Sequence, residues 1–475
     1  MRVAELSDRR VAVWGYGREG RATLAALRAR LPALRPTLFC GEAEANAILA
    51  THRSGAHGDE TFEIVPRQPS AADLSAFDIV VKSPGISAYR PEILEARHNG
   101  THFTSGTALW FAEHPEARAI AVTGTKGKST VTALIAHLLR SLGRRVALAG
   151  NIGMPLLELL DPPQPPDWWV IELSSFQTRD AACVEVAVIN NLYEEHLDWH
   201  GTRERYAGDK LALAGAARTL VANAAQPELL ARTDAHARRV AFGEAQGWHV
   251  AGGAVYRATQ RVVELATSPL PGPHNAQNLC AALAAIEAAG VFDDLGGCGD
   301  PERARRHAEL AAAIATFRPL PHRLQTLGER DGRIWIDDSI ATTPQATLEA
   351  LASLRDRRVT ALVGGHDRGL DWRPFAGQVR STPPHAIVTM GANGERIREV
   401  LRSHAGDYRL ISERSLADAV GAARRLAPAG SVVLLSPGAP SFDQFRDYAE
   451  RGCEFARLAG FDPAAIGAIE GLGIA

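Results

Sequence analysis

The sequence contains few cysteines and no cysteine pair. Its 475 residues include five, which lie far apart: Cys40, Cys183, Cys280, Cys298 and Cys453. An odd number of widely spaced cysteines without a CxxC motif argues against a disulfide framework and against a structural zinc site. We therefore expect free thiols that are buried in the core.

Long apolar runs and an excess of one charge sign are missing as well. No uninterrupted apolar stretch of about 18 residues occurs, and the first ten residues, MRVAELSDRR, lack the apolar centre of a secretory signal. The 52 Lys and Arg residues nearly balance 54 Asp and Glu residues, which gives a formal charge of −2. No global field attracts nucleic acid or an anionic membrane. We expect a cytoplasmic protein with neither of these partners.

What the sequence does contain is a regular alternation of short β-branched runs and helical stretches rich in Ala and Leu. This order predicts an α/β protein with parallel sheets covered by helices, and the length predicts several domains. Eight strands are expected, at residues 10–14, 78–81, 119–122, 168–171, 186–189, 360–363, 386–389 and 431–435. The proline-containing segment FRPLPHR, residues 317–323, is the expected joint between domains.

A glycine-rich turn follows the first expected strand. Gly15, Gly17 and Gly20, in the sequence GYGREG, lie between that strand and a helical pattern at residues 22–29. Glycine lets the backbone approach a phosphate closely, and the free N–H groups of a helix start attract an anion. An NAD site also requires an acid at the end of the next strand, but that strand ends at Cys40. A dinucleotide site, a site for another diphosphate and a structural turn all stay open.

The strongest local motif is TGTKGKST, residues 123–130, placed between an expected strand and a helix at residues 131–142. In such a loop, backbone N–H groups surround phosphate, a lysine reaches the terminal phosphates and a hydroxyl holds Mg²⁺. Lys128 and Ser129 have these two side-chain roles. The other expected phosphate-binding residues are Gly124, Thr125, Lys126, Gly127 and Thr130. The loop is shorter than the usual GxxxxGK[ST], and a solvated turn with two lysines is the alternative.

Possible metal ligands follow the next two expected strands. Glu172 begins the motif ELSSFQ after one strand, and His196 lies in EEHLD after the other. Carboxyl ends of parallel strands meet at one edge of a sheet, so both side chains are expected beside the phosphate loop. A capping or surface role is the alternative for each. His200 has the zincin spacing from His196 but no glutamate directly follows His196, so we expect His200 to be a surface or capping residue.

Taken together, these motifs resemble those of the ATP-dependent Mur ligase family, which makes peptidoglycan precursors and includes relatives similar to folylpolyglutamate synthase. Ten ordered motifs carry the resemblance over nearly the whole chain: TGTKGKST, GNIG, ELSSFQ, EEHLDWHG, YAGDK, HNAQN, LPHR, DDSIATT, GGHDRGLD and SPGAPSFDQF. The resemblance implies three α/β domains. These are a Rossmann-like UDP-substrate domain at residues 1–112, a central ATP-binding domain at 113–318 and a Rossmann-like amino-acid domain at 319–475.

The resemblance also implies roles for single residues. It assigns catalysis to Lys128, His196 and Lys210, and a magnesium site of two ions to Ser129, Glu172 and His196. Lys210, in YAGDK, matches the lysine that the family carbamylates. The implied nucleotide contacts outside the phosphate loop are Asn278, Arg323 and Asp338. The implied substrate contacts are Gly15, Gly17, Gly20, Ser83 and Asn151 for the UDP substrate, and Thr342, Arg368, Ser441 and Phe442 for the amino acid.

ELSSFQ and SFDQF resemble most closely the glutamate-adding members, which implies UDP-N-acetylmuramoyl-L-alanine and glutamate as substrates and an acyl phosphate intermediate. Those members usually carry DSKATN, whereas this chain has DSIATT, and Arg368 and Gln325 stand where they have Lys and Glu. Lys and Arg hold carboxylates differently. The altered set resembles a divergent branch that adds L-glutamate and leaves inversion to a separate epimerase. We favour L-glutamate over D-glutamate.

Two interpretations from other classes stay open. An NAD-dependent dehydrogenase explains the glycine turn at residues 15–20 but leaves the phosphate loop without a role. A non-catalytic nucleotide-binding regulator keeps the same fold. The presence of Lys128, Glu172, His196 and Lys210 counts against a decayed site.

Overall fold

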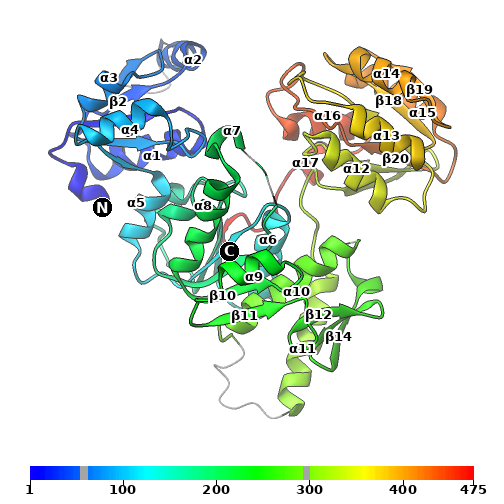
Figure 1. The fold of residues 1–475 in the computed structure, drawn as a ribbon, viewed down its shortest axis with the longest axis horizontal. Helices are drawn as coiled ribbons and strands as arrows, with labels where there is room; N and C mark the ends of the chain where they lie inside the picture. The colour runs from blue at the N-terminus through cyan, green and yellow to red at the C-terminus, as the bar shows by residue number, and fades with distance from the viewer. Residues whose placement is uncertain (54–61, 194, 196, 271, 292–299) are drawn as a thin grey trace. The chain divides into compact units, whose positions relative to one another are not determined.

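The chain forms two compact units in the computed structural model, which describes residues 1–53, 62–193, 195, 197–270, 272–291 and 300–475. The first unit comprises residues 1–317 and 471–475, and the second comprises 318–470. Both consist of sheets flanked by helices, so the expected α/β class is confirmed (Figure 1). All eight expected strands are present, with ends shifted by two residues at most.

The first sheet of the first unit is entirely parallel, in the order β3-β2-β1-β4-β5. Its strands are β1 (Val11–Trp14), β2 (Thr37–Phe39), β3 (Glu63–Val65), β4 (Ile79–Lys82) and β5 (His102–Thr104), and its helices are α1 (Arg18–Arg30), α2 (Glu42–Arg53), α3 (Ala71–Ser75) and α4 (Pro91–His98). The strand order reverses between β1 and β4. Loops that follow strands on either side of such a reversal diverge and leave room for a ligand.

The larger sheet of the first unit has the order β11-β10-β9-β6-β8-β7-β21. Its strands are β6 (Ala119–Thr123), β7 (Val146–Gly150), β8 (Trp168–Glu172), β9 (Val184–Ile189), β10 (Ala217–Asn223), β11 (Arg239–Phe242) and β21 (Gly473–Ile474). The helices are α5 (Gly106–Glu113), α6 (Lys128–Ser141), α7 (Leu197–His200), α8 (Arg203–Gly215), α9 (Pro227–Arg232), α10 (Pro273–Ala288) and α11 (Asp300–Ala315). Strand β6 lies between β8 and β9, so the three loops that follow them are neighbours.

Two parts of the first unit depart from the parallel pattern. A small antiparallel sheet consists of β12 (Trp248–Ala251), β13 (Ala254–Arg257) and β14 (Gln260–Glu264). Strand β21 pairs antiparallel with β7 at the edge of the larger sheet. The sequence analysis assigned residues 471–475 to the third domain, but they join the first unit in the structure.

The second unit contains one sheet in the order β15-β16-β20-β17-β18-β19, parallel except at β15. The strands are β15 (Gln325–Arg330), β16 (Arg333–Asp337), β17 (Val359–Val363), β18 (Ala386–Thr389), β19 (Arg409–Ser412) and β20 (Val432–Leu435). The helices are α12 (Pro344–Ser353), α13 (Arg373–Ser381), α14 (Gly394–Ser403), α15 (Leu416–Leu426), α16 (Tyr448–Ala459) and α17 (Pro463–Ile466). The order reverses at β20, beside the ends of β16 and β17.

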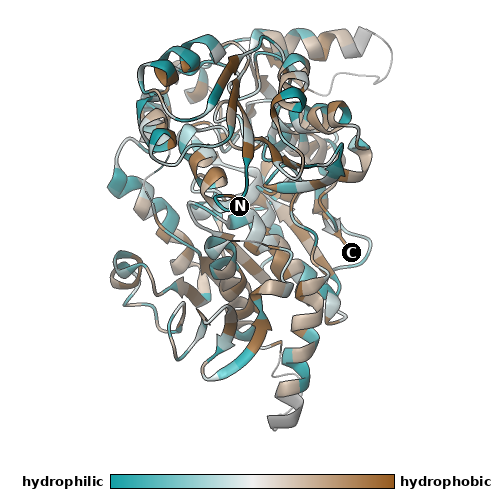
Figure 2. Cartoon of the chain, turned by 90° about the vertical axis from the view of Figure 1, so that its right-hand side faces the viewer, coloured by the Kyte–Doolittle hydropathy of each residue, from teal (hydrophilic) through white to brown (hydrophobic). Residues whose placement is uncertain are grey.

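The central strands are buried over their whole length. Every residue of β6, β7 and β8 is buried, because helices cover both faces of a parallel sheet and leave no face for water. Figure 2 shows brown, hydrophobic strands in the interior and teal, hydrophilic stretches on the helices and loops. This burial explains why continuous apolar runs, rather than alternating ones, identified the strands in the sequence.

The cysteines follow the sequence-based expectation only in part. Cys40 and Cys280 are buried and free, and Cys453 is half-buried and free. Cys183 is exposed, so the expectation of a buried thiol is wrong there, because it lies in the turn that enters β9. Cys298 lies outside the described residues. Among helices in the described part of the chain, none combines the length and apolarity needed to cross a bilayer.

The close packing between the turn after β1 and helix α1 can be tested by mutation. A Cβ atom at Gly20 would lie 1.9 Å from the carbonyl oxygen of Gly15, so Gly20→Ala forces the turn and α1 apart. We expect it to lower the free energy of unfolding by about 1–3 kcal/mol, as overpacking does. Chemical denaturation followed by circular dichroism measures this change.

Gly17→Ala is the matched control in the same turn. A Cβ atom at Gly17 meets no atom of the described residues within 4 Å. We expect a change below about 0.5 kcal/mol. Equal stability of the two variants would contradict the close packing of this turn.

Candidate functional site

The phosphate loop joins β6 to α6 through two glycines with positive φ angles. Gly124 has φ 154° and Gly127 has φ 79°, conformations that residues with a side chain rarely adopt. A Cβ atom at Gly127 would lie 2.3 Å from Oδ1 of Asn278. Helix α6 begins at Lys128, so the first N–H groups of the helix, which have no acceptor within the helix, lie at the end of the loop. Such a loop is suited to hold an anion.

Three asparagines hold this loop in shape. Asn191 accepts a hydrogen bond from the backbone N–H of Lys126 (2.7 Å), and Asn190 donates to the Lys126 carbonyl (3.0 Å). Asn190 also donates to Oδ1 of Asn278 (2.8 Å). The sequence analysis assigned Asn278 to the nucleotide; in the structure its amide also supports the loop. It gave Asn190 and Asn191 no role, although the pair NN directly after β9 was the available signal.

The first residues of α6 are placed as the motif requires. Ser129 is half-buried and Thr130 is buried in the first turn of the helix. The ammonium group of Lys128 donates to the carbonyl of Thr125 (3.1 Å). Lys126 is exposed, and its ammonium group lies 3.6 Å from a carboxylate oxygen of Glu195. The loop therefore presents hydroxyl and ammonium groups around its glycines.

Glu172 ends β8, the strand beside the phosphate loop, as predicted. It is 1% exposed. One carboxylate oxygen, Oε1, accepts a hydrogen bond from the amide of Asn151 (2.7 Å). The other, Oε2, is buried with no hydrogen-bond partner among the described residues. A buried carboxylate oxygen without a donor is costly, and a cation would satisfy it.

The donor set fits magnesium better than a transition metal. In the described part of the chain, no group of three or more His, Cys, Asp and Glu side chains is arranged to hold a metal ion. Mg²⁺ binds through one or two carboxylates together with substrate phosphates and water, so Glu172 and the hydroxyl of Ser129 suit it. His196, the other predicted ligand, lies outside the described residues.

Lys210 reaches the phosphate loop from α8. Its side chain is 2% exposed, and the ammonium group donates to the carbonyl of Gly124 (2.9 Å). Burial lowers the pKa of Lys210 well below its usual value, and the positive charge of Lys128 lowers it further. The carboxylates of Glu195 and Glu172 oppose this shift. The structure thus brings Lys210, Lys128 and Glu172 into one electrostatic environment, as the motifs predicted.

The predicted UDP-substrate residues lie at the end of the first sheet and beside the larger one. The Ser83 hydroxyl approaches the Gly15 carbonyl (3.4 Å), which joins the loops after β4 and β1. Arg18 donates from the start of α1 to the carbonyl of Gly153 (3.0 Å). That carbonyl belongs to the turn that contains Asn151. The glycine turn, Ser83 and Asn151 therefore surround one region of the first unit.

His200 is fully buried, so its expected surface or capping role is wrong. Its Nδ1 lies 2.6 Å from Oδ2 of Asp209, and its Nε2 lies 3.0 Å from the hydroxyl of Ser175. Its ring packs against Trp199 and Phe176, with centroid distances of 4.5 and 5.6 Å. These partners come from three segments, and no local pattern identified them.

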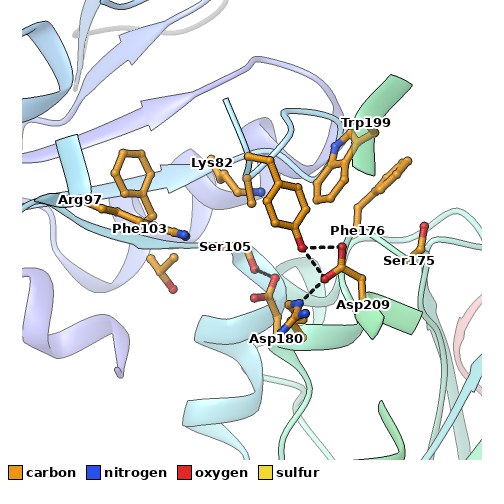
Figure 3. A pocket seen from close by; sticks show the side chains of 13 residues that line it. Lys82, Arg97, Phe103, Ser105, Ser175, Phe176, Asp180, Trp199 and Asp209 are labelled. Carbon is orange, nitrogen blue, oxygen red and sulfur yellow. Dashed lines mark hydrogen bonds and ion pairs between the residues drawn. The ribbon is translucent and has the colours of Figure 1, made fainter. Parts of the chain in front are cut away.

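A cavity of about 360 Å³ lies next to this histidine network. Lys82 at the end of β4 and Tyr89 in the segment that follows it line this cavity, together with Asp180, Trp199 and Asp209 from the segments around the larger sheet. Figure 3 shows Lys82, Asp180, Trp199 and Asp209 around it. Burial lowers the pKa of the Lys82 ammonium group and raises the pKa of the Asp180 carboxyl group. The sequence analysis gave none of these five residues a role.

In the second unit, Asp338 lies in the loop after β16 and is 6% exposed. It accepts hydrogen bonds from the hydroxyl of Ser436 (2.8 Å) and the backbone N–H of Leu324 (3.1 Å). Burial raises its pKa to about 7. The neighbouring Arg323 is half-buried, and its Nε is enclosed with no hydrogen-bond partner among the described residues.

Arg451 clamps the loops after β16 and β20. It is 1% exposed and donates to the carbonyl and hydroxyl of Ser339 (2.8 and 3.0 Å) and to the carbonyl of Ala439 (3.0 Å). These loops carry Thr342, which is half-buried, and Ser441, which is buried. The shape of the two loops is fixed by the buried guanidinium group of Arg451, which no sequence motif had identified.

The two other predicted amino-acid contacts are exposed. Phe442 is 67% exposed, and its ring lies 6.2 Å from that of His366. His366 and the exposed Arg368 share the loop after β17. The structure therefore brings Thr342, Ser441, Phe442 and Arg368 to the carboxyl ends of adjacent strands β16, β20 and β17.

Comparison with known sequences gives matches over both units. Residues 122–286 match the Mur ligase middle domain, and residues 322–438 match the Mur ligase, glutamate ligase domain. A protein of Xanthomonas axonopodis pv. citri named UDP-N-acetylmuramoyl-L-alanine--L-glutamate ligase is 51% identical over 490 aligned residues, which cover all of both chains. Proteins with the same name from Xylella fastidiosa and a Micromonospora species are 49% and 40% identical. They cover 100% and 96% of this chain, and 100% and 97% of the relatives.

Solved structures share the fold at low sequence identity. MurF from Acinetobacter baumannii gives a TM-score of 0.59 at 17% identity and covers 86% of this chain and 95% of its own. The UDP-N-acetylmuramate-alanine ligase MurC from Thermotoga maritima gives 0.58 at 20% identity, with 94% and 98% covered. These likenesses support the α/β architecture described above.

The burial of Lys210 predicts a gain in stability when it is removed. Its lowered pKa means that the folded chain binds the lysine proton more weakly than the unfolded chain does, so near neutral pH the charge opposes folding. We expect Lys210→Met to raise the free energy of unfolding by about 1–3 kcal/mol in CO₂-depleted buffer. Urea denaturation measures the difference.

Lys126→Met is the control for the loss of a lysine charge. Its side chain is 46% exposed, so the change in stability is expected to stay below about 0.5 kcal/mol. A Lys210→Met protein less stable than the unmodified chain would show that the buried ammonium group is stabilising.

Proposed function

The chain belongs to the Mur ligase family, and from this premise we propose that it joins L-glutamate to UDP-N-acetylmuramoyl-L-alanine with consumption of ATP. The observation that carries the proposal is the full-length identity of 51% to a relative named for this reaction. Family membership removes the reason to consider an NAD-dependent dehydrogenase. A non-catalytic regulator is disfavoured because Lys128, Glu172 and Lys210 surround an intact phosphate loop.

The reaction has two steps for which the site is suited. A carboxylate oxygen of the alanyl group attacks the γ-phosphorus of ATP, and ADP leaves, which gives an acyl phosphate. The glutamate nitrogen then attacks the acyl carbon, phosphate leaves, and the amine loses a proton. Negative charge concentrates on phosphate oxygens in both steps, so preorganised cations stabilise both transition states. Lys128 and Lys126 supply such charge at the loop.

In this proposal, Glu172, Ser129 and His196 are the protein ligands of two Mg²⁺ ions. When bound, Mg²⁺ offsets the charge of the phosphate oxygens. The orphaned Oε2 of Glu172 supports its role as a ligand. Two ions are proposed, with His196 at the second.

Carbamylation of Lys210 is also proposed. CO₂ reacts with the neutral amine, and the lowered pKa of Lys210 favours that form. The nitrogen loses a proton as the N–C bond forms, and the product is an anion in place of a cation, which the charge of Lys128, and of Mg²⁺ when bound, would stabilise. The modification would turn a buried charge that opposes folding into a group able to bridge a metal and the substrate.

We assign the remaining roles by domain, with residues 1–112 for the UDP substrate, 113–318 for ATP and 319–470 for glutamate, since residues 471–475 join the first unit. Gly15, Gly17, Gly20, Ser83 and Asn151 contact the UDP substrate in this scheme. Asn278, Arg323 and Asp338 contribute to the nucleotide site. Thr342, Arg368, Ser441 and Phe442 form the glutamate pocket.

The product carries an L-glutamyl residue, so an enzyme that inverts this residue is the proposed partner. ATP and UDP-linked sugars are cytoplasmic metabolites, and we therefore propose a cytoplasmic location.

The proposed reaction predicts which amino acid stimulates ATP cleavage. Phosphate release is measured with ATP, Mg²⁺ and UDP-N-acetylmuramoyl-L-alanine, and either L- or D-glutamate is added. We expect L-glutamate to give at least about tenfold higher kcat/KM, the ratio that corresponds to about 1.4 kcal/mol in the transition state. UDP-N-acetylmuramate, which lacks the alanyl carboxyl group, is the control acceptor. Preference for D-glutamate would overturn the stereochemical assignment.

The phosphate loop predicts a second kinetic result. Lys128→Ala removes a preorganised cation at the transferring phosphate, and we expect kcat to fall by at least about a hundredfold. Lys126→Ala, which removes the exposed ammonium group, is the comparison. Near-normal turnover by Lys128→Ala would place the nucleotide elsewhere.

A further inference from the structure

Three side chains converge on the carboxylate of Asp209, the residue directly before Lys210 on α8. The Tyr89 hydroxyl donates to its two oxygens (2.7 and 2.9 Å), and Nδ1 of His200 lies 2.6 Å from Oδ2. The Nε of Arg179 donates to Oδ1. Figure 3 shows the carboxylate of Asp209 at the edge of the cavity, with dashed lines that mark its interactions with neighbouring side chains. Asp209 itself is 1% exposed.

Tyr89 belongs to the segment after β4 that begins with Ser83, the predicted UDP-substrate contact. The same segment also makes two hydrogen bonds with α7. The Ser87 hydroxyl donates to the Trp199 carbonyl (2.6 Å), and the Trp199 indole donates to the Pro84 carbonyl (3.1 Å). The guanidinium group of Arg205, in the first turn of α8, lies 5.0 Å from the centre of the Tyr89 ring. Residues 83–89 are therefore fastened to α7 and to α8, the helix that carries Lys210.

The other end of the network reaches the loop after β8. His200 connects Asp209 to the hydroxyl of Ser175, three residues after Glu172. The backbone carbonyl of Asp209 accepts a hydrogen bond from the Thr178 hydroxyl (2.7 Å), which ties the same helix to that loop a second time. The carboxylate of Asp209 thus lies between the UDP-substrate segment and the loop that carries the predicted metal ligand.

Buried polar networks of this kind specify geometry more than they add stability. Apolar side chains of the same volume often stabilise a core equally well, whereas a fully satisfied network admits one arrangement. Asp209 is adjacent to Lys210 in the chain, so a shift of its carboxylate shifts the turn of α8 that holds the lysine. The network is therefore placed to transmit the position of residues 83–89 to Lys210.

We propose that Asp209 is a positioning residue that couples the UDP-substrate segment to Lys210, with Tyr89 as the contact through which the segment acts. Correct docking of residues 83–89 fixes α8, and α8 in turn fixes Lys210 at the phosphate loop. The kinetic part of this inference rests on the proposed function. Its structural part, the dependence of α8 on the Tyr89 hydroxyl, does not.

Tyr89→Phe tests the coupling because it removes one hydroxyl and leaves His200 and Arg179 on Asp209. We expect KM for UDP-N-acetylmuramoyl-L-alanine to rise about tenfold, as the loss of one hydrogen bond to a charged group implies, while KM for ATP stays within about twofold. We also expect faster amide hydrogen exchange in residues 203–210. Asp209→Asn, which removes the charge at constant size, should lower kcat by about a hundredfold with the same ATP KM.

Tyr256→Phe is the matched control. Tyr256 is another half-buried tyrosine of the first unit, in β13 of the small antiparallel sheet, and we expect it to change none of these quantities. Unchanged exchange in α8 of Tyr89→Phe would overturn the coupling. So would a lower melting temperature with both KM values unchanged, since that result indicates a purely structural role.

The same measurements separate this inference from the proposed function. If the unmodified protein releases no phosphate with the UDP substrate and glutamate, the proposed function fails. Exchange in α8 then decides the coupling by itself: faster exchange in Tyr89→Phe supports it, and identical exchange rejects it.

Discussion

The conformation of residues 124–127 is the constraint on which the rest of the site depends. Two glycines permit a backbone that other residues avoid, and the side-chain amides of Asn190, Asn191 and Asn278 hold it there. Asn190 and Asn191 reach the loop because β6 and β9 are neighbours, and Asn278 reaches it from α10. The sheet order therefore brings these supporting amides to the phosphate loop.

Buried charge is concentrated around that loop. Lys210 and Glu172 are almost inaccessible to water. The ammonium group of Lys210 donates to a backbone carbonyl instead, and one carboxylate oxygen of Glu172 has no hydrogen-bond partner among the described residues. Such an arrangement is costly in a folded protein. It suits a reaction in which charge moves between phosphate oxygens, because groups that are already oriented need no rearrangement in the transition state. In the proposed reaction, stability and catalysis thus make opposite demands on Lys210 and Glu172.

Much of this organisation was visible in the sequence, and the reason is physical. Buried parallel strands are continuous apolar runs, and phosphate loops require glycine and lysine at fixed spacing, so both leave local patterns. The missed features depend on tertiary contacts. Tyr89 and Asp209 are 120 positions apart, and the burial of His200 follows from rings that come from other segments. Cys183 was misjudged because residue type alone does not reveal a turn.

Strand β21 has a consequence for the order in which the molecule is built. It pairs with β7, but residues 151–472 separate the two along the chain, and the whole second unit lies between them. During translation β7 is synthesised long before β21. The backbone N–H and C=O groups at the outer edge of β7 therefore lack their final partner until β21 is made. Exposed edges of this kind recruit strands from other chains. The nascent first unit is thus most open to aggregation while the second is being synthesised, and docking of a two-residue strand ends that interval.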